Sequence, residues 1–149
     1  MVQLEKSFEI KAPPEKVWEM LALDRMPEWM KELKSVNYIS EVHTPKDKYK
    51  VGASARIEMK SSLEKGHDVD ITESFENEKM TYRSKPPYYT YVATYILKPV
   101  EGGTKLTWTS DSEMPWGILG KALGKLFIQR MGAKEIDKSF KNLISILEK

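Results

Sequence analysis

One glutamate and a group of tyrosines are the side chains best suited to chemistry in this 149-residue chain. Glu73 lies in a stretch where apolar and polar residues alternate, on the side predicted to be buried, beside Tyr82 and Tyr95. A carboxylate buried there must be paired or protonated, and it could serve as a polar anchor or as a general base on a bound carbonyl compound. The alternatives are an ion pair with Arg56 or Arg83, or a local bulge that turns Glu73 outward.

The other titratable side chains form no recognisable metal or catalytic site. His43 and His67 lie near predicted strand ends without a second ligand at metal-binding spacing, so both are interpreted as surface residues. Two pairs of carboxylates share the face predicted to meet water, namely Asp68 with Asp70 and Asp111 with Glu113. Phosphate-binding loops and serine-nucleophile motifs are absent, and the chain has no cysteine. The sequence therefore predicts no metal and no cofactor.

The net charge is a formal +2, which gives no general attraction to nucleic acid. The last third of the chain is more basic. We interpret its lysines as a solvated outer face, with an acidic partner or a membrane surface as the alternative. No signal peptide is visible, and no apolar run reaches the roughly 18 residues that a membrane span needs. We expect a cytoplasmic protein of one domain, without stable membrane insertion.

Strands must position most of these side chains, because apolar and polar residues alternate in successive short stretches. The predicted strands are residues 4–10, 36–42, 53–60, 68–75, 80–84, 88–98 and 105–112. Short turns join the later strands, so we expect them to pair as antiparallel neighbours. Two short helices, residues 15–21 and 24–33, are predicted between the first two strands, with Trp29, Met30 and Leu33 as the apolar side of the second.

A long helix is predicted from Pro115 to Lys149, because apolar residues recur there at helical spacing after a proline suited to the first turn. Such a helix would be roughly 50 Å long and needs a broad surface to lie against. Its apolar side shifts near Gly132. The shift predicts either a mobile first half or a helix that bends along a twisted sheet.

Alternation also assigns the face of the sheet that the helices cover. Its predicted members are Ala53, Ala55, Ile57, Met59, Val69, Ile71, Glu73, Phe75, Met80, Tyr82, Tyr91, Ala93, Tyr95, Leu97, Leu106, Trp108 and Ser110. Buried tyrosine and tryptophan need hydrogen-bond partners. An apolar cavity with a few polar tips is typical of a small-molecule site. The alternatives are an aromatic core with satisfied hydroxyls, or tyrosines that lie partly on the wet face.

The order of elements and several motifs resemble the START/Bet v 1-like helix-grip superfamily, also called SRPBCC or polyketide cyclase/dehydrase-like. The matching segments are residues 12–18, 26–29, 51–53, 71–75 and 95–108. The resemblance covers nearly the whole chain. It implies an α+β helix-grip fold as a single domain over residues 1–149. In that fold a curved seven-stranded antiparallel sheet wraps around a long C-terminal helix, with two short helices between strands 1 and 2.

By position, the resemblance implies a ligand cavity lined by residues of the sheet and of the long helix. They are Met59, Ile71, Glu73, Tyr82, Tyr91, Tyr95, Trp108 and Ser110, with Leu123, Phe127 and Met131 from the helix. Residues 85–88 and 114–116 would flank the entrance. Plant members carry a glycine-rich loop between the second and third strands, whereas this chain has residues 44–50 there without glycine, so a plant-type identity is not expected.

The superfamily includes lipid carriers, hormone receptors, quinone-binding proteins, cyclases and co-chaperones, so the fold leaves the function open. Our first hypothesis is a non-catalytic protein that binds or transports a lipid, isoprenoid, quinone or polyketide-like compound. In it Tyr82, Tyr91, Tyr95 and Ser110 orient the ligand. The second is a cyclase or dehydratase that uses Glu73 and a tyrosine. The third is a protein-interaction module like the Hsp90-activator domains, which would use the basic helix face.

Overall fold

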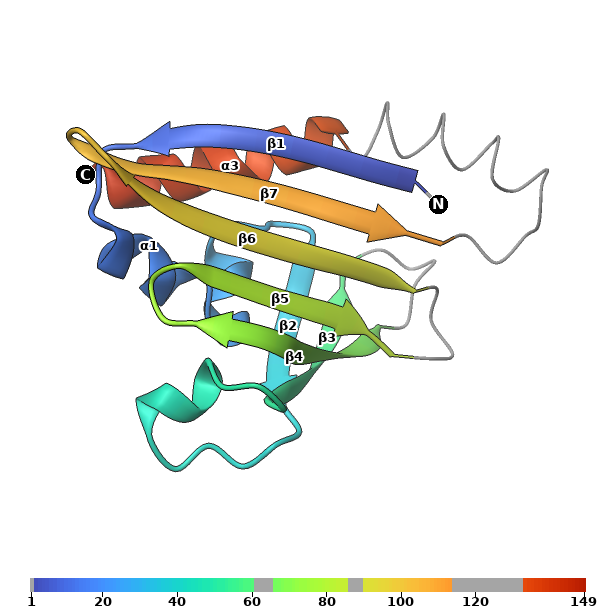
Figure 1. Ribbon diagram of the computed structural model, residues 1–149. Coiled ribbons are helices and arrows are strands. Elements are labelled where there is room, and N and C mark those ends of the chain that lie inside the picture. The colour runs from blue at the N-terminus through green and yellow to red at the C-terminus, as the bar shows by residue number, and fades with distance from the viewer. Residues whose placement is uncertain (1, 61–65, 86–89, 114–132) are drawn as a thin grey trace.

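The structure is a computed structural model that describes residues 2–60, 66–85, 90–113 and 133–149. Its strands are β1 (Val2–Ile10), β2 (Leu33–Tyr38), β3 (Ser54–Met59), β4 (His67–Phe75), β5 (Lys79–Ser84), β6 (Tyr91–Val100) and β7 (Gly103–Ser112). Its helices are α1 (Pro14–Met20), α3 (Ala133–Leu147) and the 3₁₀ helices η1 (Leu23–Glu28) and η2 (Pro45–Lys48). These strands form one antiparallel sheet in the order β1-β7-β6-β5-β4-β3-β2 (Figure 1). The predicted sheet is therefore confirmed.

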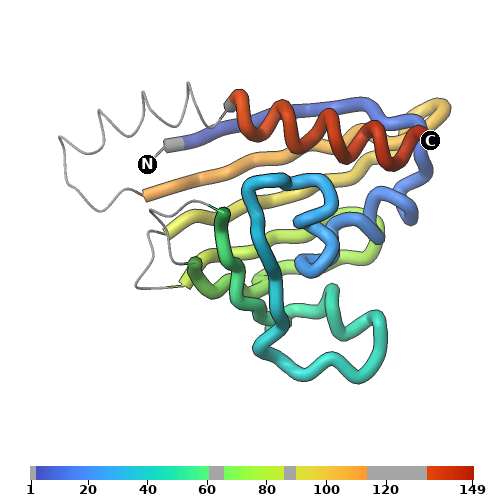
Figure 2. Tube along the Cα trace, turned by 180° about the vertical axis from the view of Figure 1, so that it is seen from behind, coloured from blue at the N-terminus to red at the C-terminus, as the bar shows by residue number. Residues whose placement is uncertain are grey.

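The helices gather on one side of the curved sheet, as seen from behind in Figure 2. α3 runs along β1 and β7 (Figure 2). Lys6 on β1 pairs with Asp137 on α3 at 3.5 Å, and just past the ends of the two elements the backbone N–H of Lys11 donates to the Glu148 carboxylate at 2.9 Å. The C-terminal helix thus lies on the sheet as expected over residues 133–147. The predicted start at Pro115 and the phase shift at Gly132 lie outside the described residues.

The second predicted helix is wrong in its type and its end. Residues 23–28 form the 3₁₀ helix η1, with Pro27 inside it, and Trp29 closes the last turn through its N–H to the Met26 carbonyl. Leu33 already begins β2. This strand therefore starts earlier than the predicted range 36–42. It also ends earlier, at Tyr38, because the N–H groups of Ile39 and Ser40 both turn to the carbonyl of Ser54.

Alternation predicts most of the covered face correctly. Twelve of its predicted members are buried, namely Ala53, Ala55, Ile57, Val69, Ile71, Met80, Tyr82, Ala93, Tyr95, Leu97, Leu106 and Trp108. Met59, Tyr91 and Ser110 are half-buried. Glu73 and Phe75 are exposed, so the prediction fails at the end of β4. The core thus lies between this face and the layer of α1, η1 and α3.

The β6–β7 hairpin fixes the corner where β1 leaves the sheet. A Cβ on Gly103 would collide with the carbonyl oxygen of Ile10, so only glycine permits this approach. The next residue, Thr104, is fully buried, and its hydroxyl donates to the carbonyl of Ala12 at 2.7 Å. These contacts hold the segment that leads from β1 into α1.

Candidate functional site

An aromatic cluster fills one part of the covered face and is centred on Phe140 of α3, which is fully buried. The Phe140 ring stacks on Phe8 with centroids 4.7 Å apart. It also meets Trp29 at 5.5 Å, Trp108 at 6.1 Å and Tyr95 at 6.4 Å. These separations lie in the range where aromatic pairs attract. The cluster is therefore the packed contact between α3 and the sheet.

A row of polar aromatic side chains continues from this cluster towards the ends of β4, β5 and β6. The hydroxyls of Tyr82 and Tyr95 lie 3.2 Å apart, and their rings stack at 5.9 Å. Tyr82 meets Tyr91 edge-on at 6.2 Å. The Tyr91 hydroxyl lies 2.6 Å from Nε2 of His67, which is 5% exposed. The sheet thus brings together the three predicted tyrosines and one histidine.

Burial keeps the inner end of this row neutral. Tyr95 is fully buried, and desolvation raises its pKa well above the ordinary value. The neighbouring Tyr82 hydroxyl raises that pKa further, whereas Trp108 opposes the rise. A phenol that does not ionise near neutral pH can donate and accept hydrogen bonds but cannot serve as an anionic base.

Two buried indoles differ in how their N–H groups are satisfied. Trp29 donates to the carbonyl of Met20 at 2.9 Å. Trp108 is 5% exposed, and its Nε1 has no hydrogen-bond partner within the described parts of the chain. An unpaired buried donor of this kind is uncommon in folded proteins and calls for an explanation. Trp108 faces Tyr95 across the β6–β7 pair, so this donor belongs to the polar row.

The expectation that Glu73 points into the covered face is wrong. The pairing of β4 with β5 shifts between Ile71 and Glu73, so Thr72 is an extra residue and the side-chain alternation reverses after it. Glu73 therefore faces solvent and pairs with Lys79 at 3.0 Å. The bulge, one of the alternatives considered for Glu73, is the arrangement found. An exposed, paired carboxylate lacks the dry surroundings that acid–base catalysis requires.

The interpretation of His67 as a surface residue is also wrong. His67 is two residues before Val69 and four before Ile71, so it shares their buried side of β4. This spacing was the signal that could have identified it. His43 is exposed as expected and lies 3.0 Å from Glu41. Among the residues that the structure describes, no group of three histidine, cysteine or acidic side chains could hold a metal ion.

The predicted carboxylate pairs lie on the outer side of the sheet, as expected. Asp68 pairs with Arg56 at 3.3 Å. Asp70 and Asp111 are half-buried and Glu113 is exposed. The helix residues Leu123, Phe127 and Met131, and the proposed entrance residues 86–88 and 114–116, lie outside the described residues. The expected ligand cavity therefore stays a prediction.

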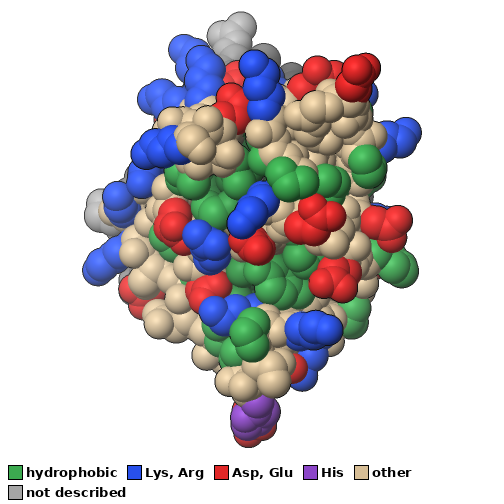
Figure 3. Space-filling model, turned by 90° about the vertical axis from the view of Figure 1, so that its left-hand side faces the viewer, with side chains coloured by type: hydrophobic (Ala, Val, Ile, Leu, Met, Phe, Trp, Pro, Cys, Tyr) green, Lys and Arg blue, Asp and Glu red, His purple; other side chains and the backbone are tan. Residues whose placement is uncertain are grey.

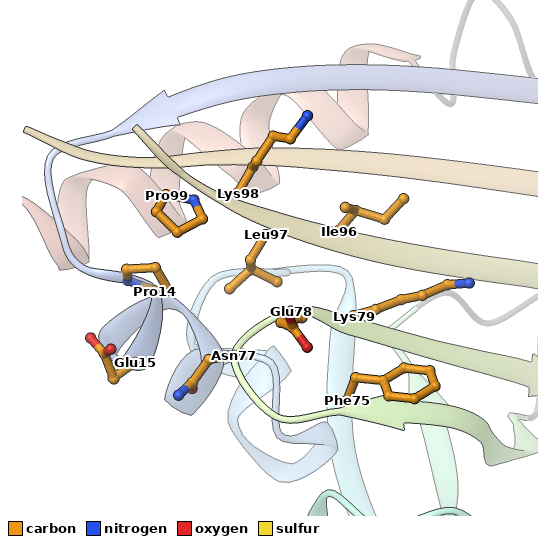
Figure 4. A pocket seen from close by; sticks show the side chains of 10 residues that line it. All are labelled: Pro14, Glu15, Phe75, Asn77, Glu78, Lys79, Ile96, Leu97, Lys98 and Pro99. Carbon is orange, nitrogen blue, oxygen red and sulfur yellow. The ribbon is translucent and has the colours of Figure 1, made fainter. Parts of the chain in front are cut away.

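A solvent-open groove of about 630 Å³ lies elsewhere, at the end of the molecule formed by α1, the β4–β5 turn and β6. Figure 3 shows apolar side chains exposed between basic and acidic ones on this side. The side chains around the groove come from all three elements, and they include the exposed Phe75 and Ile96 (Figure 4). None of the predicted ligand-binding residues lines this groove.

Comparison with known proteins agrees with the geometry. The model of a family described as polyketide cyclase/dehydrase and lipid transport matches residues 1–148. No protein with a curated description matches the sequence significantly. Within the parts of the chain described, no helix is both long and apolar enough to cross a membrane.

Several solved structures share the fold. The protein TTHA0849 from Thermus thermophilus is 20% identical with a TM-score of 0.74, covering 96% of this chain and 94% of its own. A START superfamily protein from Mycobacterium smegmatis is 15% identical with a TM-score of 0.75, covering 98% and 97%. The di-domain ARO/CYC StfQ of the steffimycin biosynthetic pathway is 10% identical with a TM-score of 0.76, covering 99% of this chain and 51% of its own. At these identities the likeness shows the fold alone, which is the helix-grip fold of the START relative.

Proposed function

Since this chain belongs to the polyketide cyclase/dehydrase and lipid transport family, we propose that it binds a hydrophobic small molecule on the covered face of its sheet. The ligand lies between the sheet and the C-terminal helical segment, beside Tyr82, Tyr91 and Tyr95. In this proposal residues 1–149 act as one START-like domain. Leu123, Phe127 and Met131 complete the apolar wall from the helix side.

One observation carries this proposal, namely the polar row on an otherwise apolar face. His67 with Tyr91 and Tyr82 with Tyr95 form two hydrogen-bonded pairs among buried aliphatic and aromatic side chains. A small-molecule site commonly has this composition, because apolar walls supply affinity and a few polar groups fix orientation. Ile71 and Met59 belong to the wall, and Ser110 opposite Ala93 adds a hydroxyl on the same face.

His67 extends the set of polar groups beyond those predicted from the sequence. Phenol and imidazole can each donate and accept hydrogen bonds, so this pair brings both kinds of polar group to the covered face. Acid–base chemistry by Glu73 with a tyrosine is no longer proposed, because Glu73 faces solvent.

The test is ligand capture by the purified protein. We expect native mass spectrometry and organic extraction to find an apolar compound, and the neutral dye Nile red to bind to the protein. Tyr91→Phe should lower the affinity of ligands that compete with the dye and carry a polar group. Tyr38→Phe is the matched control, because it removes a hydroxyl that contacts Asp24 and takes no part in the polar row. A protein that carries no apolar compound and does not bind the dye would refute the proposal and favour a protein-interaction module.

A further inference from the structure

The geometry points to a ligand whose buried end is an uncharged carbonyl, as in a ketone, quinone or ester, held by the indole N–H of Trp108 beside Tyr95. This inference rests on the proposed function and names the class of ligand for that same face. It follows from an unpaired donor, its neighbours, and the absence of a buried charged side chain among the described residues.

The buried N–H of Trp108 has no acceptor among the described residues, whereas the comparable N–H of Trp29 has one. Leaving a buried donor unpaired destabilises the folded protein, so an acceptor that arrives with a ligand stabilises it. Indole nitrogen donates only. The ligand group that meets Trp108 must therefore be an acceptor, such as a carbonyl oxygen.

Trp108 lies opposite Tyr95 in the β6–β7 register, and a weak side-chain hydrogen-bond contact from its indole opposes the rise in the pKa of the Tyr95 phenol. This contact falls short of full hydrogen-bond geometry, so the indole N–H is left without a well-placed acceptor in the described part of the chain. Tyr95 in turn contacts Tyr82 through the 3.2 Å hydroxyl pair. A carbonyl oxygen has two lone pairs, so it can accept from the indole N–H and from the neighbouring phenol together.

Among the residues described, the buried polar side chains apart from the aromatic ones are serines, threonines and His67, and none is a lysine, arginine, aspartate or glutamate. Lys6 lies opposite Trp108 on β1, but its ammonium is paired with Asp137 and its side chain is 32% exposed. A ligand carboxylate next to Trp108 would be desolvated without a free counter-charge, which strongly disfavours binding.

The experiment compares three ligands of equal chain length at pH 8 by displacement of Nile red. They are a long-chain methyl ester, the ionised fatty acid and the alkane. We expect the ester to bind about 100-fold more tightly than the acid, because only the acid buries an unpaired charge. We expect the ester to exceed the alkane by roughly 2- to 10-fold, the contribution of one hydrogen bond.

Two variants locate the contact. Trp108→Phe should remove the preference for ester over alkane, whereas Trp18→Phe, which loses an indole stacked on Tyr49 elsewhere, should keep it. Lys6→Gln should leave ester binding unchanged. The wild-type comparison stands even if Trp108→Phe folds poorly.

The possible failures are distinguishable. If no ligand of the three binds, the proposed function is wrong. If the acid binds within 10-fold of the ester, or its binding depends on Lys6, binding on this face survives and the uncharged-ligand inference is overturned. An ester preference that persists in a folded Trp108→Phe protein removes Trp108 as the donor.

Discussion

Replacing Phe140 by alanine should be among the most destabilising single changes in this protein. The side chain has a relative accessibility of 0%, and its ring meets four aromatic rings at 4.7 to 6.4 Å. Truncating a buried phenylalanine to alanine costs about 3–5 kcal/mol. The four aromatic contacts place Phe140→Ala at the upper end, about 4–5 kcal/mol, because each such pair adds to simple burial.

A graded series of substitutions separates the contribution of side-chain volume to stability from that of the aromatic ring contacts. Phe140→Leu keeps most of the apolar volume and should cost about 1–2 kcal/mol. Phe75→Ala is the matched control. Phe75 is 56% exposed, so its truncation should cost less than about 1 kcal/mol.

The assay is urea unfolding at pH 7, with the denaturant slope checked for constancy across the series. A loss of about 4–5 kcal/mol is a large share of the stability of an ordinary domain, so Phe140→Ala could be partly unfolded at room temperature. Equal losses for Phe140→Ala and Phe75→Ala would refute the reasoning. That result would mean that α3 does not dock on the sheet through this ring.

Three further predictions concern other parts of the molecule. Thr104→Val should lower the free energy of unfolding by about 1–3 kcal/mol in urea titrations, because the carbonyl of Ala12 loses a buried donor. Burial, and then the hydrogen bond with Glu135, raise the pKa of Glu32, so its contribution to stability is present at low pH and is lost as pH rises through its folded pKa. The stability of Glu32→Gln relative to wild type should therefore increase as the pH rises from about 4 to 7, measured as urea midpoints. Glu73→Gln should leave Nile red affinity unchanged, because the carboxylate faces solvent.

Each of these has a control or a contradicting result. Thr107→Val removes a hydroxyl from an exposed contact with Ser7 and should change stability by less than about 0.5 kcal/mol. A constant difference between wild type and Glu32→Gln across the pH range would show that this carboxyl does not titrate with a raised pKa. A large loss of dye affinity in Glu73→Gln would return Glu73 to the site.

The sequence was most informative where alternation ran without interruption. Every second residue is buried from Ala93 to Leu97 in β6 and from Thr104 to Trp108 in β7, and the tyrosine, leucines and tryptophan there were predicted on the correct face. Their period of two follows from the strand backbone itself, so no knowledge of the neighbours is needed. The order of elements likewise predicted the fold.

The failures in β4 have one physical cause each. The bulge at Thr72 adds a residue to one strand only, and no residue type in the sequence marks it, so Glu73 and Phe75 were placed on the wrong face. The residue type of His67 suggests an exposed side chain, whereas its spacing of two residues from Val69 indicates the buried side of β4. The contacts of Phe140 with the sheet join segments far apart in the chain, and periodicity alone cannot pair them.

The position of β1 beside β7 has a consequence for synthesis of the chain. Ile10 pairs with Thr104, and 92 residues separate Ala12 from the threonine hydroxyl whose hydrogen bond it accepts. At the usual pace of translation, roughly 5–20 residues per second, the first strand waits roughly 5–20 seconds for its partner to leave the ribosome. Until then its open edge and apolar side are available to chaperones or to other nascent chains, so yield in the cell should depend on what shields this strand during that interval.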